Sequence, residues 1–149
     1  MQRCRGWAVI ELSAIMIGIL MVAAIALLPS SKYFDFGKKA AAQADLVRLG
    51  NAISQYKANN EKYPDNLQAL LVAGGGNEAY LTALPTADPW GVTSAGINGT
   101  GGTSAYCYAR TAQGYAIWSL GPNKANNSGG SGSTLPTSFG GDDVGFLLQ

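Results

Sequence analysis

The sequence predicts an α+β fold, in which a long N-terminal α-helix packs with its second half on a small antiparallel β-sheet. Three observations support it: a long apolar run near the start, an amphipathic helical pattern after it, and short alternating segments in the last third. The 149 residues have room for one ordinary domain, with little left over for a second.

The apolar run extends from Trp7 to Leu28, and Glu11 is its one charged residue. A helix of this length, at about 1.5 Å per residue, could cross the ~30 Å core of a bilayer. Arg3 and Arg5 precede the run, so the N-terminus is expected in the cytoplasm. A secretory signal peptide would have a shorter run and a small-residue cleavage site, and a lipoprotein would have its Cys after the run, whereas Cys4 precedes it.

A plain single-pass anchor leaves Glu11 unexplained, because a carboxylate inside a membrane helix costs about 2.5–3.5 kcal/mol. One interpretation places Glu11 near the interface, where it reaches water or takes up a proton. In the other interpretation, a cation in an assembled helix bundle neutralises the Glu11 carboxylate. No Lys or Arg occurs between Glu11 and Lys32, so the cation would be the α-amino group of a neighbouring copy cut just ahead of the run.

A second helix is expected from Phe34 to Asn59, after an interruption at Pro29. Its apolar residues recur at steps of four and three and form one stripe that would dock on the domain: Ala42, Leu46, Leu49, Ile53 and Tyr56. A short helix is expected from Leu67 to Ala73, ended by the glycines at 74–76.

Alternating residues predict two strands, Ser104 to Arg110 and Tyr115 to Leu120, with a turn at Gln113-Gly114. A third short strand is expected at Val144 to Leu148. Ahead of them, the Pro- and Gly-rich segment around Trp90 reads as a loop with an apolar anchor.

Composition excludes several classes of function. Ten Lys and Arg against nine Asp and Glu give a formal charge of +1, so there is no basic patch for nucleic acid. The absence of His excludes Ser-His-Asp and Cys-His catalysis and most zinc sites. Cys107 alternates with aromatics and is interpreted as a small buried side chain. The sequence therefore predicts that the protein is not an enzyme.

The segment Gly6-Trp7-Ala8-Val9-Ile10-Glu11-Leu12 resembles the N-terminal signature of type IV pilins and type II secretion pseudopilins. The resemblance implies that a prepilin peptidase cleaves between Gly6 and Trp7 and methylates the new N-terminus at Trp7. Glu11 then becomes the fifth residue and pairs with the amine of a neighbouring Trp7 during assembly. Trp7 stands where the family usually has Phe, and Pro29 lies one place later than the family's helix-kinking Pro.

This resemblance also implies an organisation in three parts. Residues 1–6 would be the leader peptide, residues 7–30 the transmembrane and assembly helix, and residues 31–149 a pilin-like periplasmic or extracellular head that includes the second half of the helix. The precursor would be a single-pass inner-membrane protein with its N-terminus in the cytoplasm, in contact with membrane lipid before assembly. After assembly it would form a periplasmic or cell-surface filament.

An ordered set of motifs in the head is similar to the type II secretion major pseudopilin. The most specific are Asp88-Pro89-Trp90-Gly91 and Ser119-Leu120-Gly121. The resemblance implies a structural subunit of the pseudopilus, which polymerises through its N-terminal helix to drive protein export. Its partners would be other copies of itself, the prepilin peptidase, the inner-membrane assembly platform and minor pseudopilins.

Members of the family bind calcium in the loop after Ser-Leu-Gly. The matching positions are Leu120 for a carbonyl oxygen, Asn123 where Asp is usual, and the pair Asp142 and Asp143. Calcium takes six to eight oxygen ligands, and carbonyl groups serve as well as carboxylates. The alternative is that the two aspartates are solvated turn residues.

Two further functions stay open at this point. A surface type IV pilus would use the same kind of subunit, and a non-polymerising membrane-anchored binding module would keep its leader. The Asp-Pro-Trp-Gly motif and the lack of a C-terminal loop with paired Cys favour the pseudopilus over the surface pilus.

Overall fold

The computed structural model describes residues 5–26, 31–72 and 78–148. The chain divides into two units, residues 1–34 and residues 35–149, and each is described by itself. Pro29, where the helix is expected to be interrupted, lies outside the described residues, as do residues 1–4 of the predicted leader. Side chains of residues 5–9, 25–26 and 31–33 are likewise outside the description.

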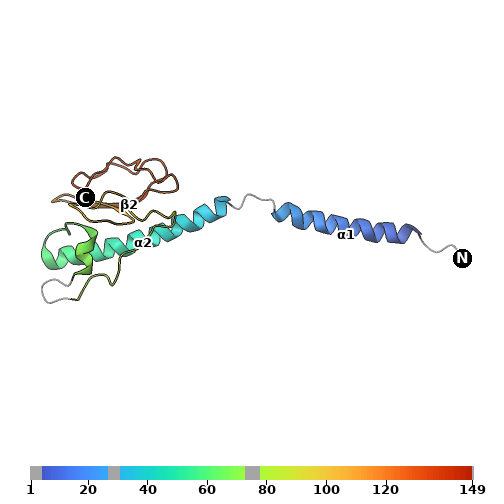
Figure 1. The fold of residues 1–149 in the computed structure, drawn as a ribbon, viewed down its shortest axis with the longest axis horizontal. Coiled ribbons are helices and arrows are strands. Elements are labelled where there is room, and N and C mark those ends of the chain that lie inside the picture. Colours follow the sequence, from blue (N-terminus) through green and yellow to red (C-terminus); the bar gives the residue numbers. More distant parts are fainter. Residues whose placement is uncertain (1–4, 27–30, 73–77, 149) are drawn as a thin grey trace. The chain divides into compact units, whose positions relative to one another are not determined.

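Helix α1 runs from Arg5 to Ala26 (Figure 1). Every described side chain on it, from Ile10 to Ala24, is exposed, including the large apolar ones. Within the described residues, no helix is both long enough and apolar enough to cross a membrane. Residues 27 and 28, the end of the apolar run, lie outside the described ranges.

Helix α2 runs from Ser31 to Asn60, slightly longer than the predicted Phe34–Asn59. The predicted stripe is confirmed: Ala42, Leu46, Leu49 and Ile53 are buried, and Tyr56 packs against the same core. Glu61, the residue after the helix, adopts a left-handed φ of 60°, and its N–H donates to the Lys57 carbonyl at 2.8 Å.

The short helix η1 covers Leu67–Leu71 and is a 3₁₀ helix, so the predicted helix to Ala73 is too long. Asn66 caps it through its side-chain oxygen, which accepts a hydrogen bond from Ala69 N at 3.1 Å. A 3₁₀ geometry suits so short a segment, because it rarely extends beyond a few residues. Residues 73–77, with the glycines expected to end the helix, lie outside the described part.

The sheet contains β1 (Cys107–Arg110), β2 (Tyr115–Ser119) and β3 (Val144–Leu148), in that order and antiparallel. The predicted three-stranded arrangement is confirmed. The predicted turn is confirmed as well, since Thr111 N donates to Gly114 O at 2.8 Å. The first strand starts three residues later than predicted. Tyr106 N donates to Ser104 Oγ at 3.2 Å, so a local turn replaces ladder pairing there.

Both faces of the sheet are covered, which gives the head three layers (Figure 1). One face packs on α2 through Tyr108, Tyr115 and Ile117, and Tyr106, just ahead of β1, joins the same core. The other face is covered by the long connection between β2 and β3, whose Leu135 and Phe139 pack around Cys107, Ala109, Ala116 and Trp118. A layer without helix or strand therefore closes the second core.

The two outer edges of the sheet differ. Along β1, Tyr108 N donates to Ile97 O and Gly99 N donates to Tyr108 O, both at 2.9 Å, so a short segment blocks that edge. Along β3, no strand among the described residues pairs with the outer edge.

Candidate functional site

The processing and assembly residues lie in helix α1. Gly6 and Trp7 fall within its first turns, and their side chains are outside the description. Glu11 is exposed, and among the described side chains it forms no ion pair. Two residues on, Ser13 Oγ donates back to the carbonyl of Ile10 at 2.8 Å, so this hydroxyl is satisfied within the helix.

The candidate cation residues meet at one end of the sheet. Asp142 and Asp143 sit in the turn before β3, so they are not in a strand and do not point to opposite faces of the sheet. Both carboxylates bind the loop that follows β2. Asp142 Oδ2 accepts from Asn123 N at 2.9 Å, and Asp143 Oδ2 accepts from Asn127 N at 2.9 Å and from the Ser128 hydroxyl at 2.5 Å.

The start of this loop lies directly against the Asp turn. Leu120 is buried, and Gly121 follows it with a left-handed φ of 66°. A Cβ on Gly121 would collide with the carbonyl oxygen of Asp142, so only glycine allows this approach. The structure therefore brings Leu120, Asn123 and both aspartates into one neighbourhood.

The residues present fit a hard cation such as calcium. Asp143 Oδ1 is buried and has no hydrogen-bond partner, which leaves one carboxylate oxygen unsatisfied. Within the described residues, no group of three or more Asp, Glu, His or Cys side chains could hold a metal ion by itself. A cation here would need carbonyl or amide oxygens as well, and calcium accepts such mixed oxygen sets.

The two most specific motifs of the head contact one another. Asp88 is buried; its Oδ1 accepts from Trp90 N at 3.0 Å and Val92 N at 2.8 Å, which forms the Asp-Pro-Trp-Gly turn. Its Oδ2 accepts from Ser119 Oγ at 2.6 Å, and that hydroxyl accepts from Gly121 N at 3.2 Å. Asp88 thus joins the turn to the end of β2, where the cation loop begins.

Cys107 is fully buried in β1, as predicted. Burial, followed by the nearby charges of Asp143 and Asp88, raises the pKa of its thiol to about 12. The reactive thiolate is therefore negligible at neutral pH, which is typical of a structural cysteine and not of a nucleophile.

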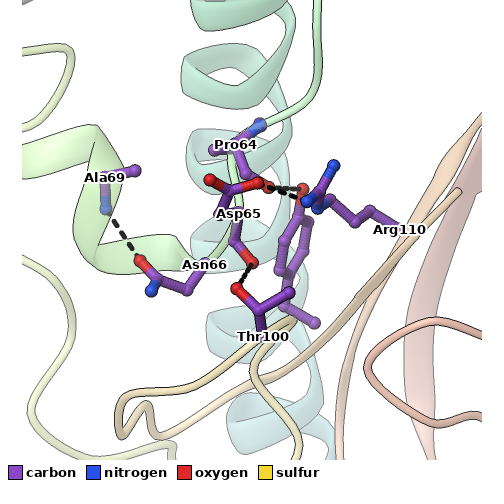
Figure 2. A network of polar contacts seen from close by, with 7 residues as sticks. Pro64, Asp65, Asn66, Ala69, Thr100 and Arg110 are labelled. Atoms are coloured by element: carbon purple, nitrogen blue, oxygen red, sulfur yellow. Dashed lines mark hydrogen bonds and ion pairs between the residues drawn. The ribbon is translucent and has the colours of Figure 1, made fainter. Parts of the chain in front are cut away.

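A second polar cluster ties η1 to the sheet (Figure 2). Asp65 forms an ion pair with Arg110, and its carbonyl accepts from Thr100 N at 3.0 Å. Pro64 contributes its carbonyl oxygen to the Tyr108 hydroxyl at 2.9 Å. The sequence contains no signal for these contacts, because the partners lie 35 to 45 residues apart.

Comparisons with known proteins agree on one family. A family model described as type II secretion system protein G matches residues 31–135. The chain is 33% identical over 100 residues to the type II secretion system core protein G of Escherichia coli K12, covering 58% of this chain and 67% of the relative. Against the protein of the same description in Klebsiella pneumoniae the identity is 34% over 105 residues, covering 61% and 72%.

Among solved structures, the chain is similar to the major pseudopilin from the type 2 secretion system of enterohaemorrhagic Escherichia coli. The TM-score is 0.46 at 23% sequence identity, and the match covers 80% of this chain and 95% of that chain.

Proposed function

This chain belongs to the protein G family of type II secretion systems, and from that premise we propose that it is a structural subunit of the pseudopilus. In this role the subunits polymerise through their N-terminal helices, and growth of the filament drives protein export. The family match favours this function over a surface type IV pilus and over a non-polymerising binding module.

The apolar surface of α1 is the observation that carries the proposal. Its described large apolar side chains are each between 56% and 70% exposed: Ile10, Leu12, Ile15, Met16, Ile17, Ile19, Leu20, Met21 and Val22. Consecutive residues such as 15–17 point in different directions around a helix, so the apolar surface surrounds it. A helix that is apolar all round needs lipid or other helices to cover it, and a filament core supplies the second.

Maturation creates the charge that Glu11 needs. Cleavage between Gly6 and Trp7 removes the leader, and methylation leaves the Trp7 amine positively charged. The carboxylate of Glu11 is exposed on α1, where the amine of a neighbouring copy can reach it. Because one buried charge left alone is costly, the pair would select the axial register at which both are neutralised.

The proposed partners follow from this assembly path. The precursor is inserted in the inner membrane through residues 7–30, with residues 1–6 in the cytoplasm and residues 31–149 in the periplasm. In the inner membrane the precursor contacts membrane lipid, the prepilin peptidase, the assembly platform and minor pseudopilins. The role is structural and requires no catalytic group.

A structural calcium ion in the C-terminal loop is the second part of the proposal. Leu120 and Asn123 from one end of the loop and Asp142 and Asp143 from the other would hold it. The buried, unpartnered Asp143 Oδ1 supports this assignment. When bound, the ion would supply positive charge to these carboxylates and would stabilise a loop rich in Gly and Ser. Thermal melting of the full chain in detergent tests it: EGTA is expected to lower Tm, and an unchanged Tm would contradict it.

The filament role is tested in the native host with Glu11→Ala and a control, Ser13→Ala, which removes an internally bonded hydroxyl from the same helix. Intact mass is expected to show loss of residues 1–6 and one added methyl group in both variants. Electron microscopy is expected to show filaments for Ser13→Ala and slow or irregular assembly for Glu11→Ala. A parent protein that keeps its leader and stays monomeric would refute the role, and normal assembly of Glu11→Ala would refute the register pair.

A further inference from the structure

A groove of about 140 Å³ lies between helix α2 and the open edge of the sheet. Val47 on α2 and Phe146 and Leu148 on β3 line it, and these apolar side chains are 60%, 44% and 41% exposed. Gly50 keeps the groove open, because a Cβ at this position would lie 3.3 Å from the Tyr115 hydroxyl and 4.0 Å from Phe146 Cδ1. The described residues of the chain therefore leave an apolar groove beside β3 open to solvent.

One aromatic ring matches the size of this groove. An apolar cavity of about 150 Å³ binds one molecule of benzene, which has the dimensions of a Phe ring. Phe36 offers such a ring on α2, where its side chain is 72% exposed. The same chain therefore carries an uncovered phenyl group and an unfilled groove of matching volume.

Phe36 cannot enter the groove of its own copy. Val47 follows it by eleven residues, or three helical turns, so both side chains lie on the same side of α2. The rise along α2 is about 16 Å from Phe36 to Val47 and about 21 Å to Gly50, which exceeds the reach of a Phe side chain. A second copy displaced along α2 by this distance brings its own Phe36 level with the groove.

The charges also favour a second copy as the occupant. Residues 31–39, around Phe36, contain three Lys and one Asp, whereas residues 40–149 contain five Lys and Arg and seven Asp and Glu. The start of α2 is therefore net positive and the rest of the head is net negative. When the start of one α2 lies against the head of another copy, opposite charges come together.

We infer that Phe36 of one copy inserts into the groove between α2 and β3 of a second, parallel copy. This rests on the proposed pseudopilus, in which all copies point the same way. Each copy offers one ring and one groove, so the contact is heterologous and can repeat without closing. It adds a contact between heads to those between N-terminal helices, and it sets the stagger of the two copies at about 16–21 Å.

Cysteine cross-linking of filaments isolated from the native host tests the pairing. Ala40→Cys and Ser54→Cys are placed together in one chain, one turn after Phe36 and one turn after Gly50, so both the ring and the groove glycine are kept. Both positions are exposed and lie about 21 Å apart along α2, so they cannot join within one copy. Oxidation is expected to give a ladder of dimers, trimers and longer cross-linked chains.

The control pair is Lys38→Cys with Ser54→Cys. Lys38 is also exposed, but it follows Phe36 by two residues and so lies on the other side of α2. This pair is expected to cross-link much less. Cys107 is buried and does not compete for oxidation in the folded head.

Phe36→Ala tests the ring itself, with Phe34→Ala as its matched control. Phe34 is 67% exposed on the same helix but points to the other side. Because both rings are exposed, neither substitution is expected to change the Tm of the full chain in detergent. Phe36→Ala is expected to reduce the amount of chain found in filaments about tenfold or more, as loss of a central aromatic anchor does, and Phe34→Ala is not.

Equal assembly of the two Ala variants, or equal ladders from the two cysteine pairs, would overturn the inference. Cross-linking that stops at dimers would indicate a closed two-fold pair, and a complete absence of cross-links between copies would indicate another occupant, such as a lipid surface. Either result would also overturn it. If the parent chain forms no filaments, the proposed pseudopilus fails as well, whereas normal filaments of Phe36→Ala would refute the ring and groove alone.

Discussion

Replacing Asp88 by Ala is expected to destabilise the head by about 3–5 kcal/mol. The carboxylate accepts hydrogen bonds from Trp90 N, Val92 N and Ser119 Oγ, and it is 4% exposed, so water cannot replace it. Each group left unsatisfied costs about 1–3 kcal/mol, less where it is only partly buried. At about 2–4 °C per kcal/mol for a chain of this size, Tm falls by about 10–15 °C.

Urea unfolding of the full chain in detergent, followed by near-UV circular dichroism, measures this effect. Asp88→Asn keeps one oxygen for the two backbone donors and is expected to lose only about 1–2 kcal/mol. Asp65→Ala is the acidic control: its side chain is 54% exposed, and surface ion pairs contribute about 0–1 kcal/mol. A loss below about 1 kcal/mol for Asp88→Ala would refute the role given to the buried carboxylate.

Three further results are expected. Gly121→Ala should lower Tm by more than Gly96→Ala. Both substitutions place a side chain at a left-handed φ, but only at position 121 does the new Cβ also meet a backbone carbonyl. Equal losses of Tm would contradict the close approach of Gly121 to Asp142. Cys107, with its pKa raised by burial to about 12, should resist iodoacetamide at pH 8 in the folded chain and react in urea, and labelling at equal rates would contradict its burial. Burial also raises the pKa values of Tyr106 and Tyr108 above their pKa of ~10 in the unfolded chain. Their contribution to the free energy of unfolding is therefore complete below pH ~10 and declines as the pH rises above it. Urea midpoints that stay constant from pH 9 to 11.5 would contradict this.

Periodicity explains what the sequence predicts well. The stripe on α2 and the hairpin of β1 and β2 follow from local spacing, because one helix face and the sheet beneath it must be buried together. The end of β1 is less predictable. A Ser104 hydroxyl competes for the Tyr106 N–H, and alternation of apolar residues carries no information about that local hydrogen bond.

The covering of the second sheet face could not be predicted in the same way. Leu135 and Phe139 are isolated apolar residues in a segment rich in Gly and Ser, and no period marks them as core. The candidate cation residues were chosen by resemblance. The contacts of Asp143 with Asn127 and Ser128 have no signal in the sequence, because they form only when a long connection closes.

The outer edge of β1, which the segment around Ile97 and Gly99 blocks, has a consequence for a protein that is present at high local concentration. A sheet with two open edges can recruit strands from both sides and grow without limit, which is how heads would fuse into an insoluble ribbon. Among the described residues, a further strand could add beside β3 but not beside β1, and two heads joined edge to edge at β3 would each use the open edge of their sheet. Unwanted pairing would then stop at two molecules.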